Sequence, residues 1–141
     1  MDKQILIVGL TCIDIINYAE SFPIEDSDSR VLEQIWSAGG NATNNVVVLN
    51  QLNSHSILFS AIPINCSIIT SLLTKVGISS KHCVHRLNGD LPTSTVIVNE
   101  RTGSRTILHY RHLRHICFLI SLRGTVARTK LRKISTCFSR Y

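Results

Sequence analysis

Short apolar runs alternate with polar segments along the first 110 residues of the chain. Residues 4–10 and 56–62 are rich in isoleucine, leucine and valine, which is typical of strands buried on both faces of a parallel sheet. Residues 42–52 and 66–76 carry apolar side chains at helical spacing, and residues 81–87 are compatible with a further short strand. This alternation predicts an α/β core.

Four further segments predict strands outside that core. Residues 13–22 and 30–36 flank the acidic, turn-forming segment 23–29, and this arrangement favours an antiparallel pair. Residues 93–98 and 105–110 are joined by a loop that contains glycine, which is typical of a β-hairpin. We therefore expect an α/β core with a β flap.

The charge of the chain changes abruptly along its length. The net charge of +6 over 141 residues is the sum of two unlike parts. Residues 1–110 hold seven basic and nine acidic residues, for a net charge of −2, whereas residues 111–141 hold eight basic residues and no acidic one, for +8. We predict a folded segment over residues 1–110 and a basic, non-homologous tail over residues 111–141, either disordered or the product of a shifted reading frame. The basic residues of the tail would attract phosphates, but the tail has few aromatic residues and no recognisable binding fold, so a nucleic-acid partner is not expected.

The cysteines and the apolar runs limit the class of protein. Five cysteines without a C-x-x-C pair argue against a disulfide framework and a zinc ribbon, and they favour a cytoplasmic protein with reduced thiols. His112, His115 and Cys117 lack a second half-site at ligand spacing, so no metal site is predicted. No apolar run is long enough to cross a membrane, and the N-terminus lacks the basic region of a signal peptide.

The segment from Gly39 to Asn44, Gly-Gly-Asn-Ala-Thr-Asn, carries the clearest chemistry. Paired glycines let the backbone approach a ligand closely, and they precede the predicted helix. Asn41 and Asn44 are three residues apart and share one face of its first turn, where amides can both donate to and accept from sugar hydroxyls. Asp14, just past a strand end, could complete a polyol site. The alternative interpretation is a loop in which asparagine caps the helix.

Taken together, these motifs resemble the ribokinase-like, phosphofructokinase B-type carbohydrate kinases. The resemblance lies in V-G-L-x-x-x-D at residues 8–14, in Gly-Gly-x-x-x-Asn at residues 39–44, and in the hairpin with Arg105. The order and spacing of Phe-Pro-Ile-Glu-Asp-Ser at residues 22–27 and of Trp36 are closest to the branch that phosphorylates fructose. The resemblance covers roughly residues 3–110. It implies the incomplete N-terminal half of a ribokinase-like fold, a Rossmann-like parallel-sheet core with a β-flap or clasp as its lid.

The resemblance also implies roles for individual residues. Family positions that bind the sugar correspond here to Asp14, Gly39, Gly40, Asn41 and Asn44. Asp26 would lie on the flap near the sugar, within reach of a partner's site in a dimer, and Arg105 would lie near the phosphates. The family uses ATP and Mg²⁺, and the flap implies a homodimer that closes the site against water.

The chain departs from the family in its last part. The family's Gly-Ala-Gly-Asp signature, which holds phosphate at a helix N-terminus and supplies the general base, has no counterpart, and no aspartate follows residue 110. No residue is therefore assigned a catalytic role, and most of the ATP site is missing. The expected activity is ATP-dependent phosphorylation of fructose or a similar ketose at a primary hydroxyl, with this chain inactive alone. The alternative is a non-catalytic truncated isoform that pairs with a full-length subunit.

Overall fold

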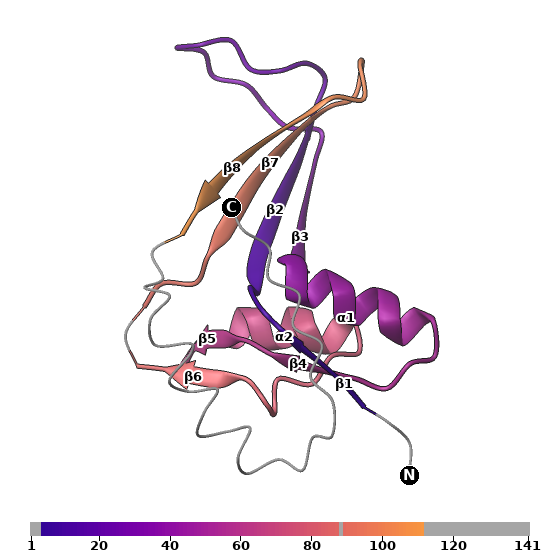
Figure 1. The fold of residues 1–141 in the computed structure, drawn as a ribbon. Coiled ribbons are helices and arrows are strands. Elements are labelled where there is room, and N and C mark those ends of the chain that lie inside the picture. Colours follow the sequence, from indigo (N-terminus) through magenta and orange to yellow (C-terminus); the bar gives the residue numbers. More distant parts are fainter. Residues whose placement is uncertain (1–3, 88, 112–141) are drawn as a thin grey trace.

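The computed structural model describes residues 4–87 and 89–111 of the chain. These residues form a small α/β core from which a long β sheet, the lid, projects to one side (Figure 1). In chain order the elements are β1 (Ile5–Val8), β2 (Cys12–Ala19), β3 (Glu33–Gly39), α1 (Asn41–Gln51), β4 (Ser56–Phe59), β5 (Ala61–Pro63), α2 (Ser67–Lys75), β6 (Val84–Arg86), β7 (Thr93–Asn99) and β8 (Arg105–Tyr110).

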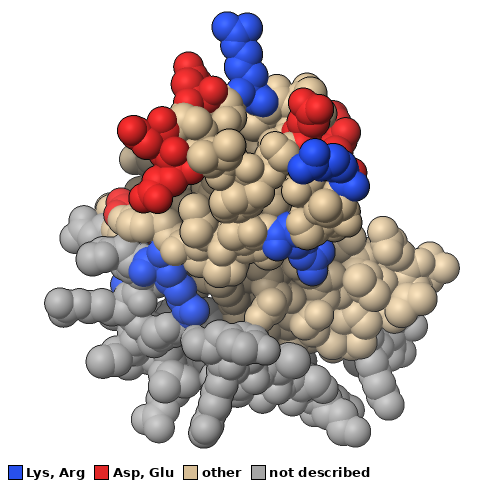
Figure 2. All heavy atoms as spheres, turned by 90° about the horizontal axis from the view of Figure 1, so that it is seen from above, with Lys and Arg blue, Asp and Glu red and all other residues tan. Residues whose placement is uncertain are grey.

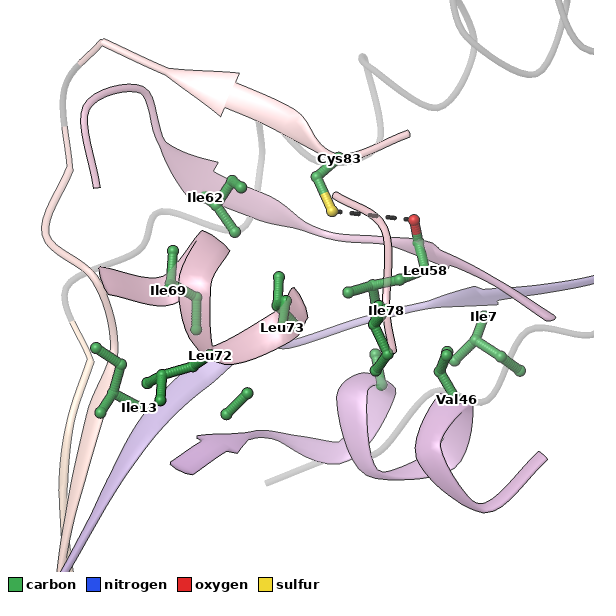
Figure 3. Close-up of a cluster of buried hydrophobic side chains, with 12 residues drawn as sticks. Ile7, Ile13, Val46, Leu58, Ile62, Ile69, Leu72, Leu73, Ile78 and Cys83 are labelled. Carbon is green, nitrogen blue, oxygen red and sulfur yellow. Dashed lines mark hydrogen bonds between the residues drawn. The ribbon is translucent and has the colours of Figure 1, made fainter. Parts of the chain in front are cut away.

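The core is built on β1 and β4, which pair in parallel from Ile5 opposite Ser56 to Val8 opposite Phe59. Consecutive side chains of a strand point to opposite faces, and both faces of this pair are apolar, as predicted for buried parallel strands. The α1 and α2 helices contribute to the cluster on one face, which is shown in Figure 3. Its members with the lowest exposure are Val46, Leu58, Ile62, Ile69 and Leu73.

The prediction of a single strand over residues 56–62 is wrong. The segment divides at Ser60 into β4, which pairs with β1, and β5, which pairs in parallel with β6. The carbonyl of buried Ser60 accepts a hydrogen bond of 2.8 Å from the amide of Val84, so the backbone changes its partner at this residue. The predicted helices over residues 42–52 and 66–76 are confirmed as α1 and α2, with ends shifted by about one residue.

The lid is a four-stranded sheet in the order β3-β2-β7-β8. Both predicted strand pairs are confirmed, because β2 and β3 are antiparallel and β7 and β8 form a hairpin. The two pairs join through a parallel pairing of β2 with β7, from Ile13 opposite Thr93 to Ala19 opposite Asn99. The strands that form the centre of the lid are thus distant in sequence, and the hydrophobic pattern alone did not predict that they pair.

Two boundaries differ from the predictions in ways that affect the site. Asp14 does not follow a strand; it is the third residue of β2. The β3 strand continues past the predicted end at residue 36, and Gly39 pairs with Cys12, so only Gly40 separates β3 from α1. The first turn of α1 therefore begins directly at the base of the lid.

Charged side chains of the described residues do not form a single patch on the face seen from above. Carboxylates gather there in two groups, with lysine or arginine side chains beside them (Figure 2). In the sequence, the loop between β2 and β3 holds four acidic residues and one basic residue: Glu20, Glu25, Asp26, Asp28 and Arg30. Among the described residues, no helix combines the length and the apolar character needed to cross a membrane.

Candidate functional site

Two glycines bring the start of α1 against the β1–β2 connection. A Cβ atom at Gly39 would overlap the carboxylate of Asp14 on the neighbouring strand. At Gly40 a Cβ atom would stand 2.5 Å from the carbonyl oxygen of Leu10, and its φ of +93° disfavours any other residue. Both positions therefore require glycine. At Gly39 there is no space for a side chain, and at Gly40 both the space and the backbone conformation exclude one.

Hydrogen bonds hold the helix start in this place. The amide of Ala42 donates to the carbonyl of Leu10 at 3.2 Å. The hydroxyl of Thr43 donates to that of Thr11 at 3.0 Å, and both threonine side chains have no exposed surface. A buried hydroxyl needs a partner, and here each hydroxyl supplies the other's. The α1 N-terminus is thus attached to the β1–β2 connection, directly before the first strand of the lid.

Asn41 and Asn44 lie in the first turn of α1, and both are exposed. The interpretation in which asparagine caps the helix is wrong, because the N-cap residue is Gly40 and no side chain caps this end. Two residues of backbone span at most about 7 Å, so the Cα atom of Asn41 lies within that distance of Gly39, which touches Asp14. Two amides and a carboxylate are therefore available on neighbouring elements, in the combination that hydroxyl groups of a polyol can bind.

Asp14 has a partner inside the lid as well. The thiol of Cys12 donates to Oδ1 of Asp14 at 3.3 Å. Burial, followed by the charge of the Asp14 carboxylate and its hydrogen bond, raises the pKa of Cys12 to about 12. The thiol therefore keeps its proton at neutral pH and acts as a fixed donor that orients the carboxylate rather than as a nucleophile.

Strand register arranges the Asp14 face of the lid in transverse rows. Opposed residues of paired strands point to the same face, so the partners of Asp14 across the sheet lie beside it. We call this set the polar row: Ser37, Asp14, Ser94 and His109. The next row on the same face is apolar and is called the apolar row: Ile35, Ile16, Val96 and Ile107. Reasoning from the sequence missed Cys12, Ser94 and His109. Ser94 and His109 come beside Asp14 only through the β2–β7 and β7–β8 pairings. Cys12 lies two residues before Asp14 on β2, so the alternation of side chains along a strand could have indicated it.

Asp26 and Arg105 lie away from the cluster formed by Asp14, Gly39 and the first turn of α1. Asp26 is exposed, with a φ of +57°, in the loop beyond the outer end of β2 (Figure 1). Arg105 lies opposite Val98, four residues along β7 from Ser94, which corresponds to about 13 Å along the strand. A single chain therefore does not bring these two residues to Asp14, and their predicted roles remain predictions.

Within residues 4–87 and 89–111, no group of three or more histidine, cysteine or acidic side chains could hold a metal ion. His112, His115, Cys117 and the basic tail fall outside the described residues, except for Arg111.

The fold and the motifs agree with the comparison to protein families. The chain matches the model of the pfkB family carbohydrate kinases over residues 2–119, and it belongs to this family. The match runs past residue 110, where the charge of the chain changes. The fold is accordingly an incomplete ribokinase-like α/β fold with a β lid.

Individual relatives indicate the branch of the family. Mouse (Mus musculus) ketohexokinase is 37% identical over 111 residues, which is 77% of this chain and 37% of that protein. Ribokinase of Arabidopsis thaliana, solved with ribose and ATP, is similar with a TM-score of 0.62 at 16% identity, covering 78% of this chain and 36% of that one. Ribokinase of Cryptococcus neoformans, solved with ADP, has a TM-score of 0.63 at 14% identity, covering 77% and 35%. The chain thus spans little more than a third of the length of these relatives.

Replacement of Gly40 by alanine should destabilise the fold more than replacement of Gly103. Both glycines have a positive φ, but a Cβ atom at Gly103 would meet nothing within 4 Å, whereas at Gly40 it meets the Leu10 carbonyl. We expect Gly103→Ala to lower the free energy of unfolding by about 1 kcal/mol and Gly40→Ala by about 3 kcal/mol or more, measured by urea denaturation. Equal losses would show that the approach to Leu10 is not tight.

Removal of the Asp14 charge should make Cys12 more reactive. Asp14→Asn takes away the negative charge that helps to raise the pKa of Cys12, so the thiolate fraction rises, although burial still favours the protonated thiol. We expect faster alkylation of Cys12 by iodoacetamide at pH 8–10, measured by peptide mass spectrometry. Cys83 is the internal control, because its pKa is raised by burial and no carboxylate contributes. An unchanged Cys12 rate in Asp14→Asn would contradict the Cys12–Asp14 contact.

Proposed function

We propose that this chain is the sugar-binding and lid part of a ketohexokinase-like carbohydrate kinase, with fructose or a similar ketose as its ligand. The observation that carries the proposal is the contact of the Asp14 carboxylate with Gly39, two residues before the helix turn that bears Asn41 and Asn44. Membership of the pfkB family and the identity to mouse ketohexokinase support the choice of a ketose.

The chemistry of binding follows from the groups present. The Asp14 carboxylate accepts hydrogen bonds from adjacent hydroxyls, and its charge makes them stronger than bonds between neutral groups. The amides of Asn41 and Asn44 donate to and accept from further hydroxyls. The Gly39–Gly40 backbone admits the Asp14 carboxylate beside it and so brings this acceptor close to the start of α1. In the complete kinase the lid would exclude water from the site.

The described residues do not fit the nucleotide. In the family, ATP supplies the phosphoryl group and Mg²⁺ neutralises its charge. Here Arg105 is the one residue that the resemblance links to phosphate, and it lies about 13 Å along the lid from the polar row. The Gly-Ala-Gly-Asp signature is absent from all 141 residues. We therefore infer that this chain binds the sugar without phosphorylating it.

The lid is also proposed to form a homodimer. Ile35 and Ile107 of the apolar row are 38% and 41% exposed, although they flank the less exposed Ile16 and Val96. Apolar side chains on an exposed sheet face favour association with a second copy. In such a dimer Asp26 at the outer end of one lid could reach the partner's site.

The exposure of the apolar row also supports a second function. The apolar row could pair with the lid of a full-length subunit, which would make this chain a non-catalytic partner in a mixed dimer. We further propose a cytoplasmic location, because the free cysteines of the described residues, Cys12, Cys66 and Cys83, are typical of a reducing compartment.

Fructose binding by the 141-residue chain tests the main proposal. We expect saturable binding by calorimetry or ligand-observed NMR, weakened about 10- to 100-fold in Asp14→Ala because one charged acceptor is lost. Asp28→Ala, in the exposed loop between β2 and β3, is the matched control and should leave the affinity unchanged. No turnover of ATP is expected with the same samples. Equal affinities of the Asp14→Ala variant and the unchanged chain would refute the proposed site.

Association through the lid can be tested with two neighbouring residues of β8. A carboxylate at Ile107 would place charge in the apolar row, so Ile107→Asp should shift the chain from dimer to monomer in light scattering with size-exclusion chromatography. Thr106→Asp adds the same charge on the opposite face of the lid and should leave the dimer intact. The same pair of variants, co-expressed with mouse ketohexokinase, tests the mixed dimer. Dimers in both variants, or in neither, would contradict the proposed interface.

A further inference from the structure

The polar row continues past Asp14 to the outer strand of the lid. Ser94 on β7 lies opposite Asp14, and His109 on β8 lies opposite Ser94. The row crosses four strands, which corresponds to about 14 Å from β3 to β8. The proposed ketose site uses only Asp14 from this row.

Hydrogen bonds connect three members of the row, Asp14, Ser94 and His109, with Cys12 as the link between Asp14 and Ser94. The hydroxyl of Ser94 and Nδ1 of His109 are 3.0 Å apart. The same hydroxyl lies 3.8 Å from the thiol of Cys12, which donates to Asp14 at 3.3 Å. Ser94 is only 2% exposed, whereas His109 is exposed. A buried serine thus connects an exposed imidazole to the residues that hold the Asp14 carboxylate.

The Ser94–His109 pair lies beside apolar side chains. The neighbouring row on the same face is apolar in all four strands, so polar side chains on this part of the lid are confined to one line. An apolar side chain in place of Ser94 would leave the strand pairing intact, because the hydrogen bonds between strands are made by backbone groups. The Ser94–His109 contact occupies Nδ1 of the imidazole and leaves Nε2 for another partner.

On the basis of the proposed function, we propose that His109 is a specificity-determining contact for the sugar and that Ser94 is the residue that positions it. The His109 imidazole would bind, through Nε2, a hydroxyl of the ketose on the side of β8, beyond the hydroxyls held by Asp14. The ligand class is a polyhydroxylated sugar with a hydroxyl at that position. For an analogue that lacks this hydroxyl, the imidazole would give no more affinity than an apolar ring at position 109.

The test uses the 141-residue chain with D-fructose and its monodeoxy analogues as probes. We expect His109→Phe to raise the Kd for fructose about 10-fold, the effect of one lost hydrogen bond. With the unchanged chain, one deoxy analogue should bind more weakly than fructose by the same factor. With His109→Phe, this analogue and fructose should bind equally well. Ser94→Ala should weaken fructose binding in the presence of His109 and have no effect in the His109→Phe background, and Ser94→Thr should restore it. Thr95→Ala, on the opposite face of β7, is the matched control.

The outcomes separate the two proposals. If Asp14→Ala weakens binding but His109→Phe and the deoxy analogues show no linked effect, the inference about His109 fails and the proposed function stands. If fructose does not bind to the unchanged chain, both fail. A direct readout guards against loss of fold in a variant: the imidazole NMR signals of His109, assigned by their loss in His109→Phe, should shift on addition of fructose to the unchanged chain. Signals that do not move would overturn the inference.

Discussion

The close approach of the Gly39–Gly40 backbone to the β1–β2 segment is the constraint on which the rest of the site depends. Gly39 lies against the Asp14 carboxylate, and Gly40 lies against the Leu10 carbonyl. Without a Cβ atom at these two positions, the base of the lid and the start of α1 come within contact distance of each other. The buried pair of Thr11 and Thr43 then holds the helix in place. The strand residue that carries the carboxylate and the helix turn that carries the two amides thereby lie on either side of one junction.

Within the lid, the register of the strands decides which side chains lie beside one another. Because opposed residues of a sheet share a face, one parallel pairing of β2 with β7 determines which side chains accompany Asp14. A shift of one residue would move Ser94 to the opposite face and bring Thr93 or Thr95 to the Asp14 face. The polar row, the apolar row and the distance of Arg105 from Asp14 all follow from this register. The lid thus combines a polar strip at its base with an apolar strip beside it, suited respectively to a hydroxylated ligand and to a second protein surface.

The incomplete fold explains why binding and phosphoryl transfer are separated in our proposals. The chain covers about 37% of mouse ketohexokinase, and the part that it covers holds the Gly-Gly-x-x-x-Asn segment and the lid. The proposed sugar contacts come from β2, the Gly39–Gly40 junction and α1, all of which lie within the first 51 residues. A base and a phosphate site would have to come from residues that have no counterpart among these 141.

The sequence by itself determined the alternation of strands and helices, both antiparallel pairs of the lid and the residues Asp14, Gly39, Gly40, Asn41 and Asn44. These features depend on local periodicity and on one short motif, which do not require knowledge of long-range contacts. Only the tertiary structure decided that β4 and β5 are separate strands, because the carbonyl of Ser60 changes partner to Val84. It also decided that Asp14 lies inside β2 and that Ser94 and His109 share its row across the lid. Pairing between strands eighty residues apart is selected by packing of whole elements, and the local pattern of neither strand contains it.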